Sequence, residues 1–350
     1  MKKWLLATLT LSIVCLLAAC GRGAAEEPTE PETPPPAEQE IPEEPPKPAF
    51  TAPLTGLGLD RPVESRPFLL VINNHSKARP QSGLSQADLF YEVLAEGEIT
   101  RILAVFQSHT FDGAIGPVRS IRPYFIDIGK SFDAIDIHAG GSPDGYAMLK
   151  KEGLDHLDEI TNAGPYYWRD KSRKAPHNLY TNLENIGKGV EKKKFATAAT
   201  NIRSFSFLPE DAAAEGEVAS AFDLTFLLKS YKVSYQYDSE QKVYKRFIND
   251  EPHTDLNNNE QLSAANVVVM EAPHKVLDDV GRRAVDLSAG GKAKIFQQGK
   301  VRPAEWRRNR TDDAIRLYIN NEEVGLVPGQ THFLIIPDKP GMEERLQYRP

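Results

Sequence analysis

Apolar residues follow a different pattern in each half of this 350-residue chain. In the first half, Phe68–Ile72 is a continuous and partly β-branched apolar run, which is typical of a buried strand. The same pattern predicts strands at 89–94, 99–106 and 134–138, and apolar spacing predicts a helix at 124–132.

Two further helix starts are visible in the first half. Ser142 followed by Pro143 supplies a cap and a first-turn proline, and Thr181 with Glu184 forms a capping box. Strands interleaved with helices indicate a mixed α/β domain over residues 55–207.

In the second half of the chain, apolar and polar residues mostly alternate. Tyr231, Val233, Tyr235 and Tyr237 alternate with polar residues and are expected to face Val243, Lys245 and Phe247 in a hairpin. Strands are also predicted at 267–270, 293–297, 315–319 and 333–336, after a connector or short helix at 211–219. The expected fold class is therefore α+β, with a mainly β C-terminal domain at 220–350 following the mixed α/β N-terminal domain.

The first twenty residues predict where the protein works. Lys2 and Lys3 precede an apolar segment at 5–17, and Leu17-Ala18-Ala19-Cys20 resembles a bacterial lipobox. The apolar segment is shorter than the roughly 20 residues of a membrane-spanning helix, so 1–19 is interpreted as a lipoprotein signal peptide and Cys20 as the lipidated residue. The alternative is a short buried N-terminal helix. The first interpretation predicts an extracytoplasmic protein anchored to the cell membrane by lipid.

Residues 20–54 form the anchor and a segment rich in Pro and Glu, which has too few apolar residues for a core. At about 3.1 Å per residue this tether could extend on the order of 100 Å. The alternative is a disordered leader without a selected length.

Charge and cysteine content exclude several kinds of chemistry. The formal net charge of -7 becomes -9 once Lys2 and Lys3 are removed, which argues against a nucleic-acid partner. Cys15 would be removed and Cys20 acylated, so thiol catalysis and disulfides are not expected.

Arginines near residue 120 are the first candidate for binding chemistry. Arg119 and Arg122 lie in a turn just before a predicted helix, where they could clamp a carboxylate or phosphate. Alternatively, one or both pair with Asp112, Asp127 or Glu92.

His138 is a second candidate, because it ends a predicted strand on the same face as Asp136. Ser142 lacks the Gly-x-Ser-x-Gly spacing of a nucleophile elbow and is better explained as a helix cap. His75, Asp88, Glu92, Asp136, His138 and His177 show no metal-ligand spacing, so neither a metal nor a cofactor is predicted.

The segment 168–178 is dense in basic residues and follows Tyr166 and Tyr167. It could be a platform for a sugar ring with an anionic substituent, or a solvated loop.

Several blocks of this chain resemble those of the YerB-like lipoproteins of Gram-positive bacteria. They are Asn73-Asn74-His75, 78–84, 116–120, 138–142 and 169–178, followed by 267–269, 273–278, Trp306 and 328–331. The resemblance covers nearly all of 59–337 and implies a two-part extracytoplasmic lipoprotein without an established catalytic activity. It also implies an association with cell-wall synthesis machinery. His332 departs from the tryptophan usual in the family's Pro-Gly-Gln-Thr-Trp ending.

Two hypotheses follow. The favoured one is a non-catalytic binding or scaffold module of the cell envelope, which recognises an anionic wall component or a partner such as a penicillin-binding protein through an Arg/His-lined cleft. Its expected ligand-binding residues are Asn74, His75, Arg79, Arg101, Arg119, Arg122, His138, Ser142, Arg169, Arg173, His177 and Asn178. The alternative is a wall-modifying hydrolase or transferase with His138 or His177 as general base and Asp136 or Glu92 as its orienting group.

Overall fold

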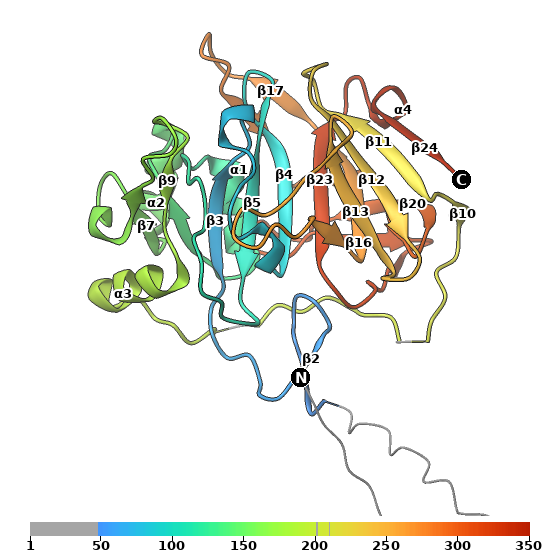
Figure 1. Ribbon diagram of the computed structural model, residues 1–350, viewed down its shortest axis with the longest axis horizontal. Helices are drawn as coiled ribbons and strands as arrows, with labels where there is room; N and C mark the ends of the chain where they lie inside the picture. Colours follow the sequence, from blue (N-terminus) through green and yellow to red (C-terminus); the bar gives the residue numbers. More distant parts are fainter. Residues whose placement is uncertain (1–47, 201, 210) are drawn as a thin grey trace, which may run out of the picture. The chain divides into compact units, whose positions relative to one another are not determined.

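The structure, a computed structural model, describes residues 48–200, 202–209 and 211–350 (Figure 1). The predicted signal peptide, Cys20 and the tether as far as residue 47 lie outside the described residues. Within the described ranges, no helix combines the length and apolar character needed to cross a bilayer.

A sheet of 12 strands runs through both halves of the sequence, and 11 of its strands follow the order β22-β21-β20-β19-β16-β23-β4-β5-β3-β6-β7. Its strands are β3 (Phe68–Asn73), β4 (Leu89–Glu96), β5 (Ile99–Phe106), β6 (Ile135–His138), β7 (His156–Asp158), β10 (Glu217–Val218), β16 (Asn266–Ala272), β19 (Gly291–Gln297), β20 (Lys300–Arg307), β21 (Arg316–Ile319), β22 (Glu322–Glu323) and β23 (Thr331–Pro337). The short β10 pairs with β20.

A second sheet of six strands comes from the second half of the chain. It contains β11 (Ala221–Thr225), β12 (Lys232–Asp238), β13 (Val243–Ile248), β14 (Glu251–Pro252), β15 (Ser263–Ala264) and β24 (Leu346–Arg349). Three two-stranded pairs join β1 (Phe50–Thr51) to β2 (Gly58–Leu59), β8 (Trp168–Arg169) to β9 (Leu179–Tyr180), and β17 (His274–Val276) to β18 (Arg283–Val285).

The part of the chain that the structure describes contains few helices. They are α1 (Pro123–Lys130), α2 (Pro143–Glu152), α3 (Leu183–Lys193) and α4 (Met342–Arg345), with 3-10 turns η1 (Ser76–Ala78), η2 (Leu84–Gln86) and η3 (Gly164–Tyr166). Three of these four α-helices lie in the first half, so the two successive parts of the chain are built differently. The described residues are mostly β-structure.

Both faces of the large sheet are buried, which the alternation along β4 illustrates. Phe90 and Leu94 point into a core shared with the second sheet, whereas Leu89, Tyr91 and Val93 point into a core shared with α1. The strands predicted at 68–72, 89–94, 99–106 and 134–138 are confirmed, as are the helices that begin at Pro123 and Pro143.

Two local predictions need correction. In the hairpin of β12 and β13, Tyr235 pairs with Arg246 and Tyr237 with Tyr244, one residue away from the predicted partners. Asn182 rather than Thr181 caps α3, because the Thr181 hydroxyl donates to the Tyr166 carbonyl. Of the two alternatives for 211–219, the connector is confirmed, because its described residues contain no helix and the segment ends in β10.

The two halves are joined in the middle of the large sheet. Strand β23 lies between β16 and β4 and is parallel to both, with Phe333 opposite Tyr91. The remaining strands of each half continue outward from this junction.

A buried ion pair connects the second sheet to the junction. Glu92 of β4 accepts from the Arg246 guanidinium of β13 at 2.6 Å, and both side chains are fully buried. Asn74, Thr100 and Tyr231 also donate to Glu92. Arg246 and Tyr231 come from the second half of the chain and Asn74 and Thr100 from the first, so the carboxylate is hydrogen-bonded by both halves.

His332 is part of the same network. Its ring stacks on Phe90 with centroids 3.7 Å apart, and its two nitrogens meet the Tyr235 hydroxyl and the Gln330 amide oxygen at 2.8 Å each. The histidine thus fills the position where the family resemblance led us to expect tryptophan and adds two hydrogen bonds.

Replacing Glu92 by Gln should destabilise the protein strongly, because the Arg246 charge would remain buried without its carboxylate. The expected loss is about 3–5 kcal/mol in the free energy of unfolding, measured by urea denaturation. The double variant Glu92→Gln, Arg246→Met should recover part of that loss. A single-variant loss below about 1 kcal/mol would contradict this assignment.

Candidate functional site

The candidate site lies at the carboxyl ends of parallel strands. Strands β3, β6 and β7 are parallel neighbours, and ligands of α/β sheets bind at this kind of edge. The segment 116–122 crosses the edge, since Arg119 bonds through its backbone to Val71 on one side and Ala139 on the other. Loops that are far apart in sequence therefore meet there.

His75 and His177 form the centre of the site. Their rings stack with centroids 4.6 Å apart and planes inclined by 27°. Asn73 holds both, because its amide oxygen accepts from the His75 backbone N–H at 3.0 Å and its amide nitrogen meets His177 Nδ1 at 3.0 Å.

These contacts determine the tautomers of the neutral rings. Nδ1 of His75 accepts from the Lys77 backbone N–H, and Nδ1 of His177 accepts from the Asn73 amide. The ring proton of each neutral histidine is therefore on Nε2. Neither Nε2 is enclosed or hydrogen-bonded to a described residue, so both N–H groups face solvent.

The electrostatic surroundings of the two rings are cationic. Burial lowers the pKa of both histidines, and nearby cations lower it further. Those cations are Lys77, Arg79 and Arg119 for His75, and Arg119, Lys77 and Arg173 for His177, which also feels His75. No carboxylate is among the groups that shift either pKa, so the pair lies in a locally positive environment.

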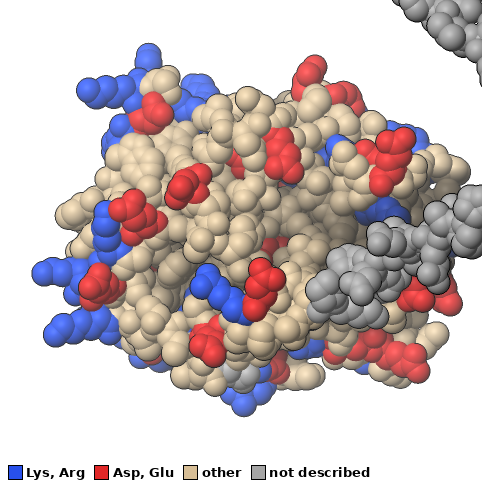
Figure 2. All heavy atoms as spheres, turned by 60° about the horizontal axis from the view of Figure 1, so that its bottom comes forward, with Lys and Arg blue, Asp and Glu red and all other residues tan. Residues whose placement is uncertain are grey.

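Arg119 adds a free guanidinium to this surface. It is partly exposed, and among the described residues its side chain has no hydrogen-bond or ion-pair partner. Figure 2 shows Lys and Arg protruding at the end of the molecule that carries the first half, with Asp and Glu among them. Burial lowers the pKa of Arg119, and Glu96, which is itself paired with Arg101 and Arg122, raises it.

Two other predicted arginines support this cluster. Arg173 donates to the carbonyls of Ala78 and Pro80 at 2.6 and 2.7 Å, which ties the 169–178 loop to the loop after β3. Arg79 lies over the Tyr231 ring, 5.0 Å from its centroid. Asn74 points inward to Glu92 and is not available to a ligand.

Arg101 and Arg122 do not share this surface. Both are buried and both bond to Glu96, with Arg122 at 2.5 Å and Arg101 at 2.6 and 2.7 Å. Burial lowers the pKa of Arg101 to about 9, which leaves it charged at neutral pH. The predicted clamp of Arg119 with Arg122 is therefore corrected, because only Arg119 is free.

Ser142 and Arg122 instead line a separate pocket of about 380 Å³ beside the β17–β18 hairpin. Ser142 caps α2, accepting from the Gly145 N–H at 3.1 Å. Its predicted role as a cap is confirmed.

His138 is enclosed in a network of its own. Its side chain is fully buried, Nδ1 meets the Gly140 carbonyl at 2.9 Å, and Nε2 meets His156 at 3.0 Å. Burial lowers its pKa to about 4, although the nearby Asp158 raises it. Both ring nitrogens are occupied, so His138 cannot take a proton from a ligand in this arrangement.

The orienting groups considered for catalysis also lie elsewhere. Asp136 is buried beneath α1, where a Cβ on Gly129 would stand 2.4 Å from its Oδ1. Burial raises the pKa of Asp136 well above its usual range. Glu92 is paired with Arg246, and His177 with Asn73. The base and orienter pairs considered from the sequence are therefore not formed.

The remaining predicted residues are peripheral. Arg169 is exposed and contacts Glu159 at 3.2 Å, while Asn178 closes its own loop by donating to Asp170 and Arg173 carbonyls. Asn73 and Lys77 were not predicted, although Asn73 belongs to the Asn-Asn-His block. Among the described residues, no group of three or more His, Cys, Asp or Glu is placed to hold a metal ion.

Comparison with known proteins assigns this chain to a family. The family described as "Protein of unknown function (DUF3048)" matches through its N-terminal domain at residues 54–196 and its C-terminal domain at 222–333. The chain is 34% identical over 340 residues to "Putative lipoprotein YerB" of Bacillus subtilis (strain 168), covering 97% of this chain and 96% of that protein.

A solved structure agrees with this assignment. The crystal structure of YerB protein from Bacillus subtilis matches with a TM-score of 0.77 and 34% identity, over 86% of this chain and 99% of that chain. The family resemblance predicted from the sequence blocks is therefore confirmed, and the chain belongs to the YerB-like lipoproteins, the two-part DUF3048 family.

Proposed function

We propose that this protein is a lipid-anchored binding module of the cell envelope, which recognises an anionic wall component at His75, His177 and Arg119. The observation that carries the proposal is a set of donors without acceptors: two outward N–H groups and one free guanidinium. Donors of this kind suit phosphate or carboxylate oxygens, because Glu96, the carboxylate that acts on Arg119, is already paired with Arg101 and Arg122.

The predicted lipobox at Cys20 and the lipoprotein name of the Bacillus relative support the anchor. A membrane-tethered module that binds wall polymers needs a spacer long enough to reach them and does not need a catalytic site. The Pro/Glu-rich segment before residue 48 supplies a spacer of suitable composition.

Binding rather than catalysis is favoured by the state of the histidines. His138 is enclosed, and His177 is oriented by a neutral amide instead of a carboxylate. An acidic segment of a wall-synthesis protein could use the same donors, and capture of such a protein from cross-linked cells would reveal it.

Arg119→Gln should weaken binding to wall fragments that carry phosphodiester polymers by about ten-fold, because it removes the free charge of the site. Pull-down of purified protein with such fragments, and calorimetric titration with the isolated polymer, measure the effect. The melting temperature should stay unchanged, since Arg119 has no structural partner among the described residues.

Arg169→Gln is the matched control, because it removes an equal charge from an exposed side chain already paired with Glu159. Equal binding by wild type and Arg119→Gln would contradict the proposed site. Loss of capture of a protein partner from cross-linked cells, with wall binding intact, would favour the partner interpretation.

Binding should strengthen as pH falls. Burial and cations lower the pKa of His75 and His177 in the free protein, whereas an anion beside Nε2 favours the charged ring and raises it. The Kd should therefore fall as the pH drops through the pKa of the histidines in the complex. It should level off below the pKa of the histidines in the free protein. Titrations from about pH 8 to about pH 5, with a phosphodiester ligand of constant charge, measure this slope. His177→Asn should flatten it, and the exposed His109→Asn should not; a flat wild-type profile would contradict the histidine role.

A further inference from the structure

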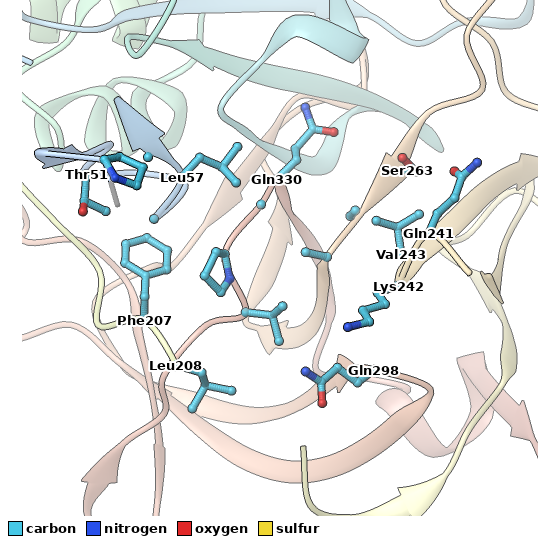
Figure 3. A pocket seen from close by; sticks show the side chains of 18 residues that line it. Thr51, Leu57, Phe207, Leu208, Gln241, Lys242, Val243, Ser263, Gln298 and Gln330 are labelled. Carbon is cyan, nitrogen blue, oxygen red and sulfur yellow. The ribbon is translucent and has the colours of Figure 1, made fainter. Parts of the chain in front are cut away.

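A large pocket lies away from the arginine and histidine cluster. It has a volume of about 940 Å³ and is bounded by the β1–β2 pair, the segment at 207–208, the β12–β13 turn and the loop at 327–330 (Figure 3). Pockets of 300–1,000 Å³ are typical of small-molecule sites. None of its lining residues belongs to the site described above.

One wall is apolar and held in place by close packing. Leu57 is 50% exposed, and Phe207 packs so tightly that a Cβ on Gly56 would stand 2.5 Å from its ring. Gly56 has a φ of +68°, a conformation that favours glycine. The turn can therefore approach the phenyl ring, and the wall is preformed.

The opposite side carries polar groups without partners. Figure 3 shows Gln241, Lys242 and Ser263 there, across the pocket from Leu57 and Phe207. Among the described residues, none of these three side chains has a hydrogen-bond or ion-pair partner. By contrast, Gln298 and Gln330, which also line the pocket, are engaged with backbone groups.

Lys242 is the charged residue of the lining. The 18 lining residues include no Asp or Glu, although the chain has 49 acidic residues in all. An ammonium facing a pocket without carboxylates attracts an anion.

We propose that this pocket binds a single-chain anionic amphiphile, with its carboxylate or phosphate at Lys242 and its apolar chain along Phe207 and Leu57. Unpartnered polar groups on one side and apolar groups on the other match a ligand with a head and a tail. A peptide would instead need hydrogen-bonding groups distributed along its length.

Calorimetric titration of the purified protein with decanoate and decyl phosphate, below their aggregation concentrations, tests the proposal. The two probes distinguish a carboxylate head from a phosphate head. Wild type should bind at least one probe saturably, and Lys242→Gln should weaken that binding by about ten-fold. Decanol, which has the chain without the charge, should bind more weakly than the anions.

Two matched variants keep the test specific. Lys229→Gln removes the same charge from an exposed position outside the lining and should bind as wild type does. Leu57→Asp places a carboxylate on an already exposed apolar wall position and should abolish binding without unfolding the protein. Arg119→Gln should leave amphiphile binding unchanged, so the two sites succeed or fail separately.

Three results would overturn the proposal: no saturable binding by wild type, equal affinity of wild type and Lys242→Gln, or equal affinity for decanol and the anions. If the amphiphiles do not bind and an acidic, proline-rich peptide with the sequence of residues 37–48 does, the pocket is assigned to a peptide.

Discussion

The buried pair of Glu92 and Arg246 is the contact on which the two halves of this protein depend. A carboxylate and a guanidinium can be buried away from water only if each of their polar atoms has a hydrogen-bond partner. Asn74, Thr100 and Tyr231 meet the carboxylate, while Tyr235 and His253 meet the guanidinium. These groups come from both halves of the chain, so the halves cannot separate without exposing a charge that has lost its partner.

The same network prepares the surface site. In the Asn73-Asn74-His75 segment, the middle side chain points inward and bonds to Glu92, while its neighbours face the site. Gln81 continues the chain of hydrogen bonds from Asn74 to His253. The positions of the two histidines therefore rest on a hydrogen-bonded interior network, which reduces the ordering cost of ligand binding.

Local patterns in the sequence predicted most strands of the large sheet, because continuous and alternating apolar runs report burial directly. Partners were harder to predict, since pairing depends on contacts between distant segments. Nothing near Arg122 in sequence indicates that Glu96 neutralises it, and nothing near His138 indicates the stacked His156. The parallel junction of β23 with β4 joins residues more than 200 positions apart and leaves no periodic signal. The histidine and arginine cluster was predicted as residue types, but which of them stay free was decided by tertiary contacts.

The position of β23 also has a consequence for the order of folding. Residues 331–337 fill the centre of the sheet, although they follow all its other strands in the sequence. A polypeptide that emerges with its N-terminus first cannot close this sheet until residues 331–337 have been made. Strands β4 and β16 each keep an unpaired edge until then, so the large sheet stays incomplete during most of synthesis.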